Sequence, residues 1–232
     1  MQGKKPPSPE TFIAGRDALE NLEPLKQLFT WIGQHIHANR ISAARLLGGA
    51  AAIATHTVSP VAGTAAYLVN TAGDWVDGAV ARNAGQRTKE GAILDPLVDK
   101  IVTGMTLWYI AAVHSNDNLP FLAAVGVSTL TDFIVQRMRG PFRSQLHDAL
   151  KAALHPTLCE AIPPGENIQK IEATTLGKIK FILQSLAVTA LLSLPGNDTV
   201  ENIFAAGSLG VCVGLGANSF VKRIRQSKKP RA

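Results

Sequence analysis

The sequence predicts an all-α integral membrane protein, a bundle of six transmembrane helices preceded by an N-terminal amphipathic cytoplasmic helix. Three observations support this fold class. The apolar residues gather into six helix-length runs, and the lysines and arginines fall in alternate connections between those runs. Charged residues make up only 17% of the chain, below the usual quarter of a soluble domain. The mean hydropathy of +0.13 leans toward a membrane protein without deciding the matter.

The N-terminal segment, residues 1–40, carries an amphipathic stripe. Its apolar residues recur at steps of three and four, as one face of a helix requires: Leu22, Leu25, Phe29, Ile32 and Ile36. Such a helix either lies in the headgroup plane of a membrane or packs on the bundle. The sequence pattern is compatible with both positions of this helix.

Six apolar runs follow within residues 41–221, which form the predicted membrane domain, and a basic tail of residues 222–232 comes after them. In order, the expected helices cover residues 41–57, 59–82, 95–113, 119–137, 179–194 and 200–221. Several are shorter or weaker than the about 20 apolar residues that a lone spanning helix needs. A soluble bundle of buried helices is therefore the alternative.

The positions of the basic residues favour the membrane. The turns HTVSP, HSNDNLP and PGNDTVEN contain no Lys or Arg, and all 23 basic residues lie in the first 45 residues, in residues 82–100 and 137–180, or in the tail. Basic connections of membrane proteins stay in the cytoplasm, whereas a soluble bundle has no reason to sort them. We therefore expect a protein of the cell (inner) membrane with both termini in the cytoplasm.

Four aspartates stand at the seam between the second and third apolar helices. Asp74 and Asp77 are three residues apart, and Asp95 and Asp99 are four apart, so each pair projects from one face of its helix. If the two helices are neighbours, the four carboxylates converge, and carboxylates at membrane depth usually face a functional cavity. Their repulsion requires a cation such as Mg²⁺, Mn²⁺ or Ca²⁺, which take oxygen ligands. Two such ions can clamp a phosphate.

The residues between the aspartates suit a nucleotide. Asp95 before Pro96 would also make a good helix start, which is a structural explanation for that one aspartate. The planar guanidinium of Arg82 suits a phosphate. Three small residues would let a flat group approach the backbone, namely Gly78, Ala81 and Gly91. Together these residues suggest a nucleotide diphosphate site.

The complete pattern resembles the signature of the CDP-alcohol phosphotransferase (CDP-alcohol phosphatidyltransferase) family in every fixed position. It reads Asp74-x-x-Asp77-Gly78-x-x-Ala81-Arg82, then eight residues, then Gly91-x-x-x-Asp95-x-x-x-Asp99. Upstream, Asn39-x-Ile41-Ser42-x-x-Arg45 is similar to the start of that family's first span. The resemblance extends over the six-helix layout. It implies a membrane enzyme that transfers a phosphatidyl group from CDP-diacylglycerol to an alcohol and releases CMP.

The resemblance also implies a role for each residue of the signature. By position, Asp74, Asp77 and Asp95 would bind a pair of Mg²⁺ or Mn²⁺ ions that grip the diphosphate. Asp99 would approach the metals and act as the general base toward the acceptor hydroxyl. The nucleotide would contact Asp74, Gly78, Ala81, Arg82 and Gly91. The resemblance suggests a homodimer in the lipid bilayer with a site open to the cytosol, and nothing in the sequence resembles a nucleic-acid-binding module.

Two further stretches bear on the acceptor alcohol. LGKIKFILQ at residues 176–184 and TDFIVQRMR at residues 131–139 resemble segments of phosphatidylglycerophosphate synthases. This implies glycerol 3-phosphate as the acceptor, with a phosphate site made by Arg139, Lys178 and Lys180. Thr131 departs from that pattern, in which arginine is usual, and the lysines would also suit the flank of a span.

Several alternatives stay open at the level of the sequence. Inositol phosphate, inositol, serine or phosphatidylglycerol could be the acceptor, the last as in a cardiolipin synthase. A membrane scaffold or transporter without catalysis is a further class, although the intact set of aspartates argues against it.

Overall fold

The computed structural model describes residue 20, residues 22–114, 118–137, 140–162 and 175–194, and a few single positions between 199 and 210. In those ranges the chain is helical and forms no β-strand; one isolated antiparallel bridge joins Thr88 to Ala161. The expected sixth helix at residues 200–221 lies almost wholly outside the described residues, and the basic tail lies entirely outside them. The all-α prediction is confirmed for the part that is described.

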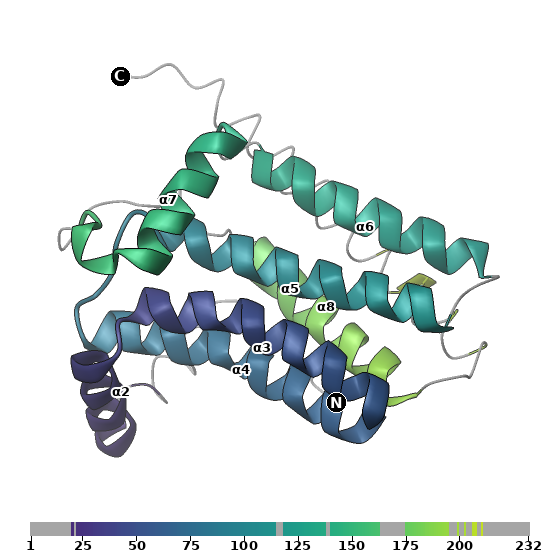
Figure 1. Cartoon of the computed structure of the whole chain (residues 1–232), viewed down its shortest axis with the longest axis horizontal. Helices are drawn as coiled ribbons and strands as arrows, with labels where there is room; N and C mark the ends of the chain where they lie inside the picture. The colour runs from purple at the N-terminus through teal and green to yellow at the C-terminus, as the bar shows by residue number, and fades with distance from the viewer. Residues whose placement is uncertain are drawn as a thin grey trace, which may run out of the picture.

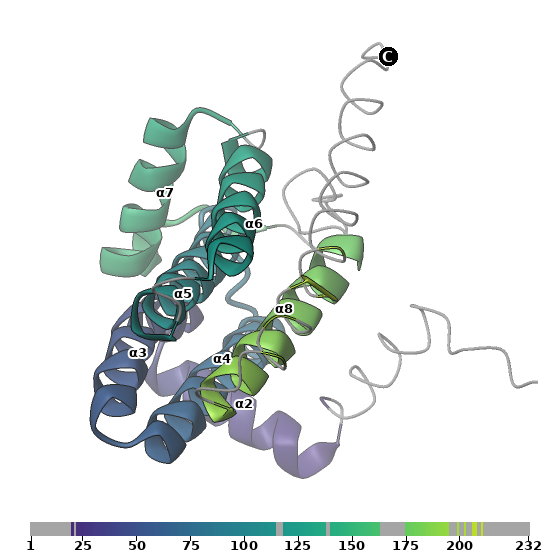
Figure 2. The same cartoon turned by 90° about the vertical axis from the view of Figure 1, so that its right-hand side faces the viewer.

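In the described ranges the helices are α2 (Glu23–His35), α3 (Ala38–Val58), α4 (Pro60–Asn83), α5 (Gly91–His114), α6 (Leu119–Arg137), α7 (Phe142–Leu154), the 3-10 turn η1 (Pro156–Leu158) and α8 (Thr175–Ser193). Helices α3 to α6 follow one another along the chain in the order that the first four apolar runs predict. Helix α3 packs against α4 and α5, α6 packs against α5, and α8 contacts both α4 and α5 (Figures 1 and 2).

A single residue reverses the chain between α3 and α4. Ser59 has an extended backbone conformation, and its hydroxyl accepts a hydrogen bond from the N–H of Ala62 at 3.4 Å. Pro60 follows at the first helical position, where its missing N–H costs nothing. Gly63 lets the two helices approach closely here, because a Cβ at this position would collide with the backbone of His56. The C-terminal end of α4 therefore returns to the N-terminal end of α3.

Helix α5 begins four residues earlier than the sequence predicts. We expect a start at Asp95 from the Asp95-Pro96 pair, but the helix starts at Gly91 and contains Pro96 in its interior. The reason is a cap further upstream: the hydroxyl of Thr88 accepts a hydrogen bond from the N–H of Gly91 at 3.0 Å, and its carbonyl accepts from the N–H of Ala92 at 3.1 Å. Asp95 is therefore a helix-interior residue, and its carboxylate is free of a capping role.

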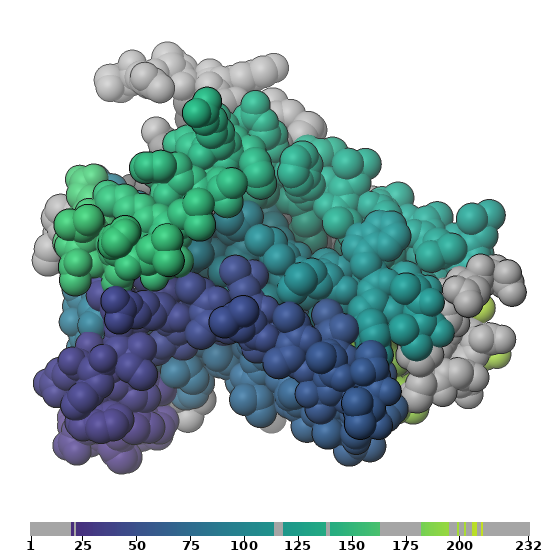
Figure 3. All heavy atoms as spheres, in the orientation of Figure 1, coloured from purple at the N-terminus to yellow at the C-terminus, as the bar shows by residue number. Residues whose placement is uncertain are grey.

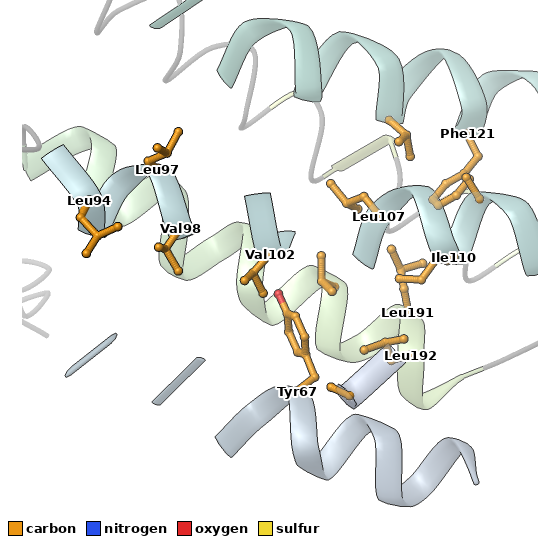
Figure 4. Packing of buried hydrophobic residues seen from close by; sticks show 14 of the residues in the cluster. Tyr67, Leu94, Leu97, Val98, Val102, Leu107, Ile110, Phe121, Leu191 and Leu192 are labelled. Carbon is orange, nitrogen blue, oxygen red and sulfur yellow. The ribbon is translucent and has the colours of Figure 1, made fainter. Parts of the chain in front are cut away.

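The hydrophobic core lies between α4, α5, α6 and α8 (Figure 4). Tyr67 of α4 is 1% exposed and lies between Val102 of α5 and Leu192 of α8 in that view. Toward the other side of α5, Phe121 of α6 packs near Ile110. The core thus fixes α5 in the middle of the bundle, and α5 carries two of the four predicted aspartates.

Two amphipathic helices, α2 and α7, lie at the same end of the molecule (Figure 3). Helix α2 packs on α4 through Phe29, which is 2% exposed and meets the ring of Trp75 edge to face at a centroid distance of 5.3 Å. Leu28 and Trp31, on its other face, are exposed. One face of α2 therefore packs on the bundle, and its position relative to a membrane stays a prediction.

Two of the described helices are long and apolar enough to cross a membrane, judged by length and composition. They are the stretch Gly91–Val113 of α5 and the whole of α6. Ile182–Ser193 of α8 is apolar but shorter. These helices match the third, fourth and fifth apolar runs of the sequence.

Candidate active site

One guanidinium gathers three of the predicted carboxylates where α3 begins and α4 ends. Arg45 of α3 donates from Nη1 to Asp74 Oδ1 at 3.0 Å and to Asp77 Oδ2 at 3.3 Å. Its Nη2 donates to Asp99 Oδ1 at 2.6 Å, and its Nε donates to the carbonyl of Asn70 at 3.2 Å. Arg45 is only 5% exposed. All of its donor edges therefore face α4 and α5.

Asp95 belongs to the same cluster. The side chain of Ser42, on α3, interacts with the carboxylates of both Asp77 and Asp95, and the charge of Asp95 acts on its neighbours in the cluster. The carboxylates range from the 2% exposed Asp77 to the side chain of Asp74, which is 34% exposed. The structure thus brings the four predicted aspartates together from α4 and α5, as their helical spacing predicts.

The donor set suits a hard divalent cation, because all four side chains offer carboxylate oxygens. Within the described residues, however, no group of three or more His, Cys, Asp or Glu is spaced to hold a metal ion. The guanidinium of Arg45 lies among the carboxylates instead. Arg45 shows that these carboxylates accommodate a positive group, and a metal ion bound there would compete with Arg45 for the same oxygens.

The turn between α4 and α5 is fastened to the start of α3. Gln86 accepts a hydrogen bond from the N–H of Ala38 at 2.9 Å and donates to the carbonyl of Gly33 at 2.6 Å. Asn39 donates from Nδ2 to the hydroxyl of Thr88 at 3.2 Å. Gly91 is buried beneath this pair, and a Cβ on it would lie 2.6 Å from Asn39 Oδ1. The side chain of Asn39 therefore fills the space that we expect a nucleotide to use at Gly91.

The same turn is held from the other side by the segment after α7. Residues 87–89 and 160–162 pair through antiparallel backbone hydrogen bonds. Glu90 accepts from Lys151 Nζ of α7 at 2.5 Å and from the N–H of Glu160 at 2.9 Å. Burial would raise the pKa of Glu90, but these hydrogen bonds outweigh it and hold the pKa below its ordinary value. The pair of Glu90 and Lys151 thus anchors α7 next to the start of α5.

The remaining residues of the signature lie on the last turns of α4. Ala81 is partly buried and packs against the small cluster formed by Phe29, Ala38, Ala79 and Val80. Arg82 is partly exposed and forms a two-point ion pair with Glu20 of the N-terminal segment. Its guanidinium lies over Gly78.

The predicted acceptor site is described only in part. Arg139 lies outside the described residues, and for Lys178 and Lys180 the helix α8 is described but the side chains are not. Next to them, Gln184 of α8 donates to Asp132 Oδ2 of α6 at 3.4 Å, and Lys100 Nζ of α5 donates to the carbonyl of Asp132 at 3.0 Å. These hydrogen bonds therefore form a polar connection between α5, α6 and α8. Its member on α5, Lys100, directly follows Asp99. The role of the three basic residues stays a prediction.

Sequence reasoning missed the central position of Arg45 and the partner of Arg82. Arg45 belongs to the motif at the start of the first predicted span, but the sequence pattern assigns it no role in the site. Its signal was its position, since it is the last charged residue before a charge-free run that ends at Gly73. A basic group there, close to several carboxylates, is a candidate counterion. For Glu20, nothing in the local sequence pattern indicated a contact with Arg82.

Comparison with known proteins places this site in a family. The family model described as CDP-alcohol phosphatidyltransferase matches residues 35–214, which include every residue of the aspartate cluster. Three curated relatives carry the name CDP-diacylglycerol–glycerol-3-phosphate 3-phosphatidyltransferase. The relative from Pseudomonas fluorescens is 37% identical over 67 residues, covering 29% of this chain and 34% of its own length.

The two other relatives match over longer stretches. The protein of Blochmanniella floridana is 29% identical over 134 residues (58% of this chain, 59% of that protein), and the protein of Sodalis glossinidius is 26% identical over 137 residues (59% and 63%). The chain thus spans less than two thirds of the length of each of these relatives. No solved structure matches the chain. The family match covers well over half of the chain, and the chain belongs to the CDP-alcohol phosphatidyltransferase family.

Proposed function

We propose that this chain transfers a phosphatidyl group from CDP-diacylglycerol to glycerol 3-phosphate and releases CMP. Family membership supports the reaction type, and the names of the three relatives support the acceptor. The observation that carries the proposal is the convergence of Asp74, Asp77, Asp95 and Asp99 on one cationic position at the end of the bundle. A bundle with a purely structural role has no use for four carboxylates there.

We place the enzyme in a membrane, with six spans, cytoplasmic termini and a cytoplasmic site. Large apolar side chains on the outside of the helices support this setting, since a soluble protein rarely exposes such a surface. Leu47 of α3 is 77% exposed, Val61 and Val69 of α4 are 83% and 74% exposed, and Leu119 of α6 is 73% exposed. Of the basic connections, the described turn between α4 and α5 and the described helix α7 lie at the end of the bundle that holds the aspartates, in agreement with a cytoplasmic site. A homodimer is the assembly that the family likeness favours.

In the proposed reaction, the hydroxyl oxygen of the acceptor bonds to the phosphorus of the phosphatidyl group. The bond from that phosphorus to the oxygen bridging to CMP breaks, and this oxygen keeps the electron pair and leaves on CMP. Asp99 takes the proton of the acceptor hydroxyl. Its contact with Arg45 at 2.6 Å fixes the carboxylate in place, and a base must be positioned before its pKa matters.

The other members of the signature would bind and orient the donor. Asp74, Asp77 and Asp95, with Asp99 beside them, would hold Mg²⁺ or Mn²⁺, which when bound neutralises the charge of the diphosphate. Arg82 would donate to a donor phosphate, Gly78 and Ala81 would lie against the nucleotide, and Gly91 would do so once the side chain of Asn39 moves aside. Arg139, Lys178 and Lys180 would bind the phosphate of the acceptor, which would lie near the polar connection of Lys100, Asp132 and Gln184.

Release of CMP by the purified full chain in detergent tests the proposal. The assay contains CDP-diacylglycerol and Mg²⁺ or Mn²⁺, and compares glycerol 3-phosphate, inositol phosphate, inositol, serine and phosphatidylglycerol as separate acceptors. We expect release with glycerol 3-phosphate and its loss in Asp99→Asn. Release that depends on another acceptor would keep the reaction type and replace the acceptor. Folded protein that releases CMP with none of them would refute the proposed activity and leave the scaffold alternative.

A further inference from the structure

Glu20 holds the arginine of the signature by two hydrogen bonds. Arg82 donates from Nε to Glu20 Oε2 at 2.8 Å and from Nη2 to Glu20 Oε1 at 2.7 Å. The carboxylate is buried, with 6% of its side chain exposed, while 34% of the Arg82 side chain is exposed. The contact joins residues 62 positions apart in the chain. It is therefore a tertiary contact between the N-terminal segment and the last turn of α4.

The pair also determines where the guanidinium lies. A Cβ on Gly78 would be 3.1 Å from Nη1 of Arg82 and 3.2 Å from its Nη2, and these are the nearest atoms to that position. The planar group thus covers the open side of Gly78, one turn earlier on α4. The contacts with Glu20 and Gly78 show that the side chain of Arg82 runs along α4 toward the preceding turn.

A carboxylate and a phosphate oxygen pair bind arginine in the same way. The Nε and Nη2 edge of a guanidinium offers two parallel N–H donors, and either anion accepts both. Glu20 uses that edge here. A phosphate that approached Arg82 in the two-point geometry would therefore have to replace Glu20. A flat group that approached Gly78 would have to replace the guanidinium.

We propose that Glu20 competes with the diphosphate of the nucleotide for Arg82, so that donor binding breaks the Glu20–Arg82 pair and uncovers Gly78. This inference rests on the proposed function, which makes Arg82 and Gly78 part of the donor site. Glu20 then weakens donor binding and sets the affinity of the site from outside the signature. It is not a catalytic residue, since it leaves before the donor occupies the site.

The affinity for CDP in the presence of Mg²⁺ tests this competition, measured by isothermal titration calorimetry on the full chain in detergent. Glu20→Gln removes the charge and keeps the shape of the side chain. Glu23→Gln is the matched control, since it makes the same change at an exposed residue of the first turn of α2. Arg82→Gln removes the shared partner. The midpoint of thermal unfolding, measured for each variant, verifies that it is folded.

We expect Glu20→Gln to bind CDP about two- to fivefold more tightly than the unaltered chain, because a partly exposed ion pair contributes only modestly. Glu23→Gln should leave the affinity unchanged, and Arg82→Gln should weaken it strongly. The KM for CDP-diacylglycerol should fall in Glu20→Gln, with little change in kcat.

Each other outcome has a definite meaning. Unchanged affinity in Glu20→Gln would overturn the competition and leave the donor site standing. Weaker binding would also overturn it, because Glu20 would then orient Arg82 for the nucleotide. CDP binding by Arg82→Gln equal to that of the unaltered chain would remove Arg82 from the site. Absence of CDP binding in the unaltered chain and in Glu20→Gln, both folded, would refute the nucleotide site itself along with the competition.

Discussion

Helices α3, α4 and α5 have buried polar groups near both of their ends, and the two ends differ in charge. Near the turn between α3 and α4, His56 is 4% exposed; its Nδ1 lies 2.9 Å from the hydroxyl of Tyr109 and its Nε2 lies 3.1 Å from the carbonyl of Leu192. Both of these partners are neutral groups. These two contacts connect α3 with α5 and α8, and neither partner carries a charge that would need a counterion.

At the opposite end, a single guanidinium faces four carboxylates. If all four aspartates were ionised, Arg45 alone would compensate only one of their four negative charges. Buried charge is costly unless it is paired, so this end has a requirement for more positive charge that the His56 end lacks. The comparison shows that one end of the bundle is connected through neutral groups, whereas the other gathers several carboxylates around one guanidinium, an imbalance that the proposed metal ions would offset.

The largest effect should come from Asp99→Asn at the charged end. We expect CMP release to fall by about two to four orders of magnitude, because the amide cannot accept the acceptor proton and a positioned base contributes that much. The protein should stay folded, since the change removes one of several mutually repelling charges. The measurements are CMP release and the midpoint of thermal unfolding. Activity within a factor of ten of the unaltered chain would exclude Asp99 as the base.

Arg45→Met should have the largest effect on stability. It leaves buried carboxylates without their counterion, which costs about 3–5 kcal/mol for a buried pair that loses one partner. Mg²⁺ or Mn²⁺ should restore part of the loss and raise the unfolding midpoint more in this variant than in the unaltered chain, because a ligand of the folded state stabilises it.

Arg82→Met is the matched control for Arg45→Met, since Arg82 is partly exposed and pairs with one carboxylate. Its unfolding free energy should fall by less than that of Arg45→Met, because the change affects the counterion of one buried carboxylate, Glu20, rather than of several. Equal losses in the two arginine variants, or an equal response to metal, would contradict the assignment of Arg45 as the counterion of the cluster.

A change at the neutral end should affect stability through packing. In Gly63→Ala the new methyl group would collide with the backbone of His56, and we expect a loss of about 1–3 kcal/mol or more from overpacking. Gly104→Ala on α5 is the control, since nothing lies within 4 Å of the position of its Cβ. Its unfolding free energy should change by about 1 kcal/mol at most. Equal midpoints for both variants would show that α3 and α4 separate easily at Gly63.

Local pattern was sufficient to predict most helices and the convergence of the aspartates. The predicted helix at Leu119–Arg137 is confirmed at both ends, because polar residues flank the apolar run on both sides. The spacing of Asp74 and Asp77, and of Asp95 and Asp99, fixes one face on each helix, so neighbouring helices bring the four together. The predicted start of α5 at Asp95 is wrong, because the residue that caps the helix is Thr88 and not Asp95.

The contacts that sequence reasoning missed depend on how whole elements pack. Whether Arg45 meets the carboxylates depends on the rotation and register of α3 against α4, and spacing within one helix carries no information about either. The pairing of Glu20 with Arg82 joins segments far apart in the chain, for which a single sequence gives no signal. The metal ions, the nucleotide contacts and the acceptor pocket stay predictions that only binding and activity can test.

The smallest effect should come from Tyr109→Phe at the neutral end. The change removes one hydroxyl that lies 2.9 Å from His56 Nδ1 and keeps the ring, which meets the imidazole edge to face. The second ring nitrogen keeps its carbonyl partner on α8, so the imidazole stays in place and we expect a loss of about 1 kcal/mol in unfolding free energy. CMP release should not change, because this end contributes no charge to the aspartate cluster. A fall in CMP release comparable to that of a signature variant would mean that the two ends are coupled through α3 and α5, and the distinction between a structural end and a reactive end would fail.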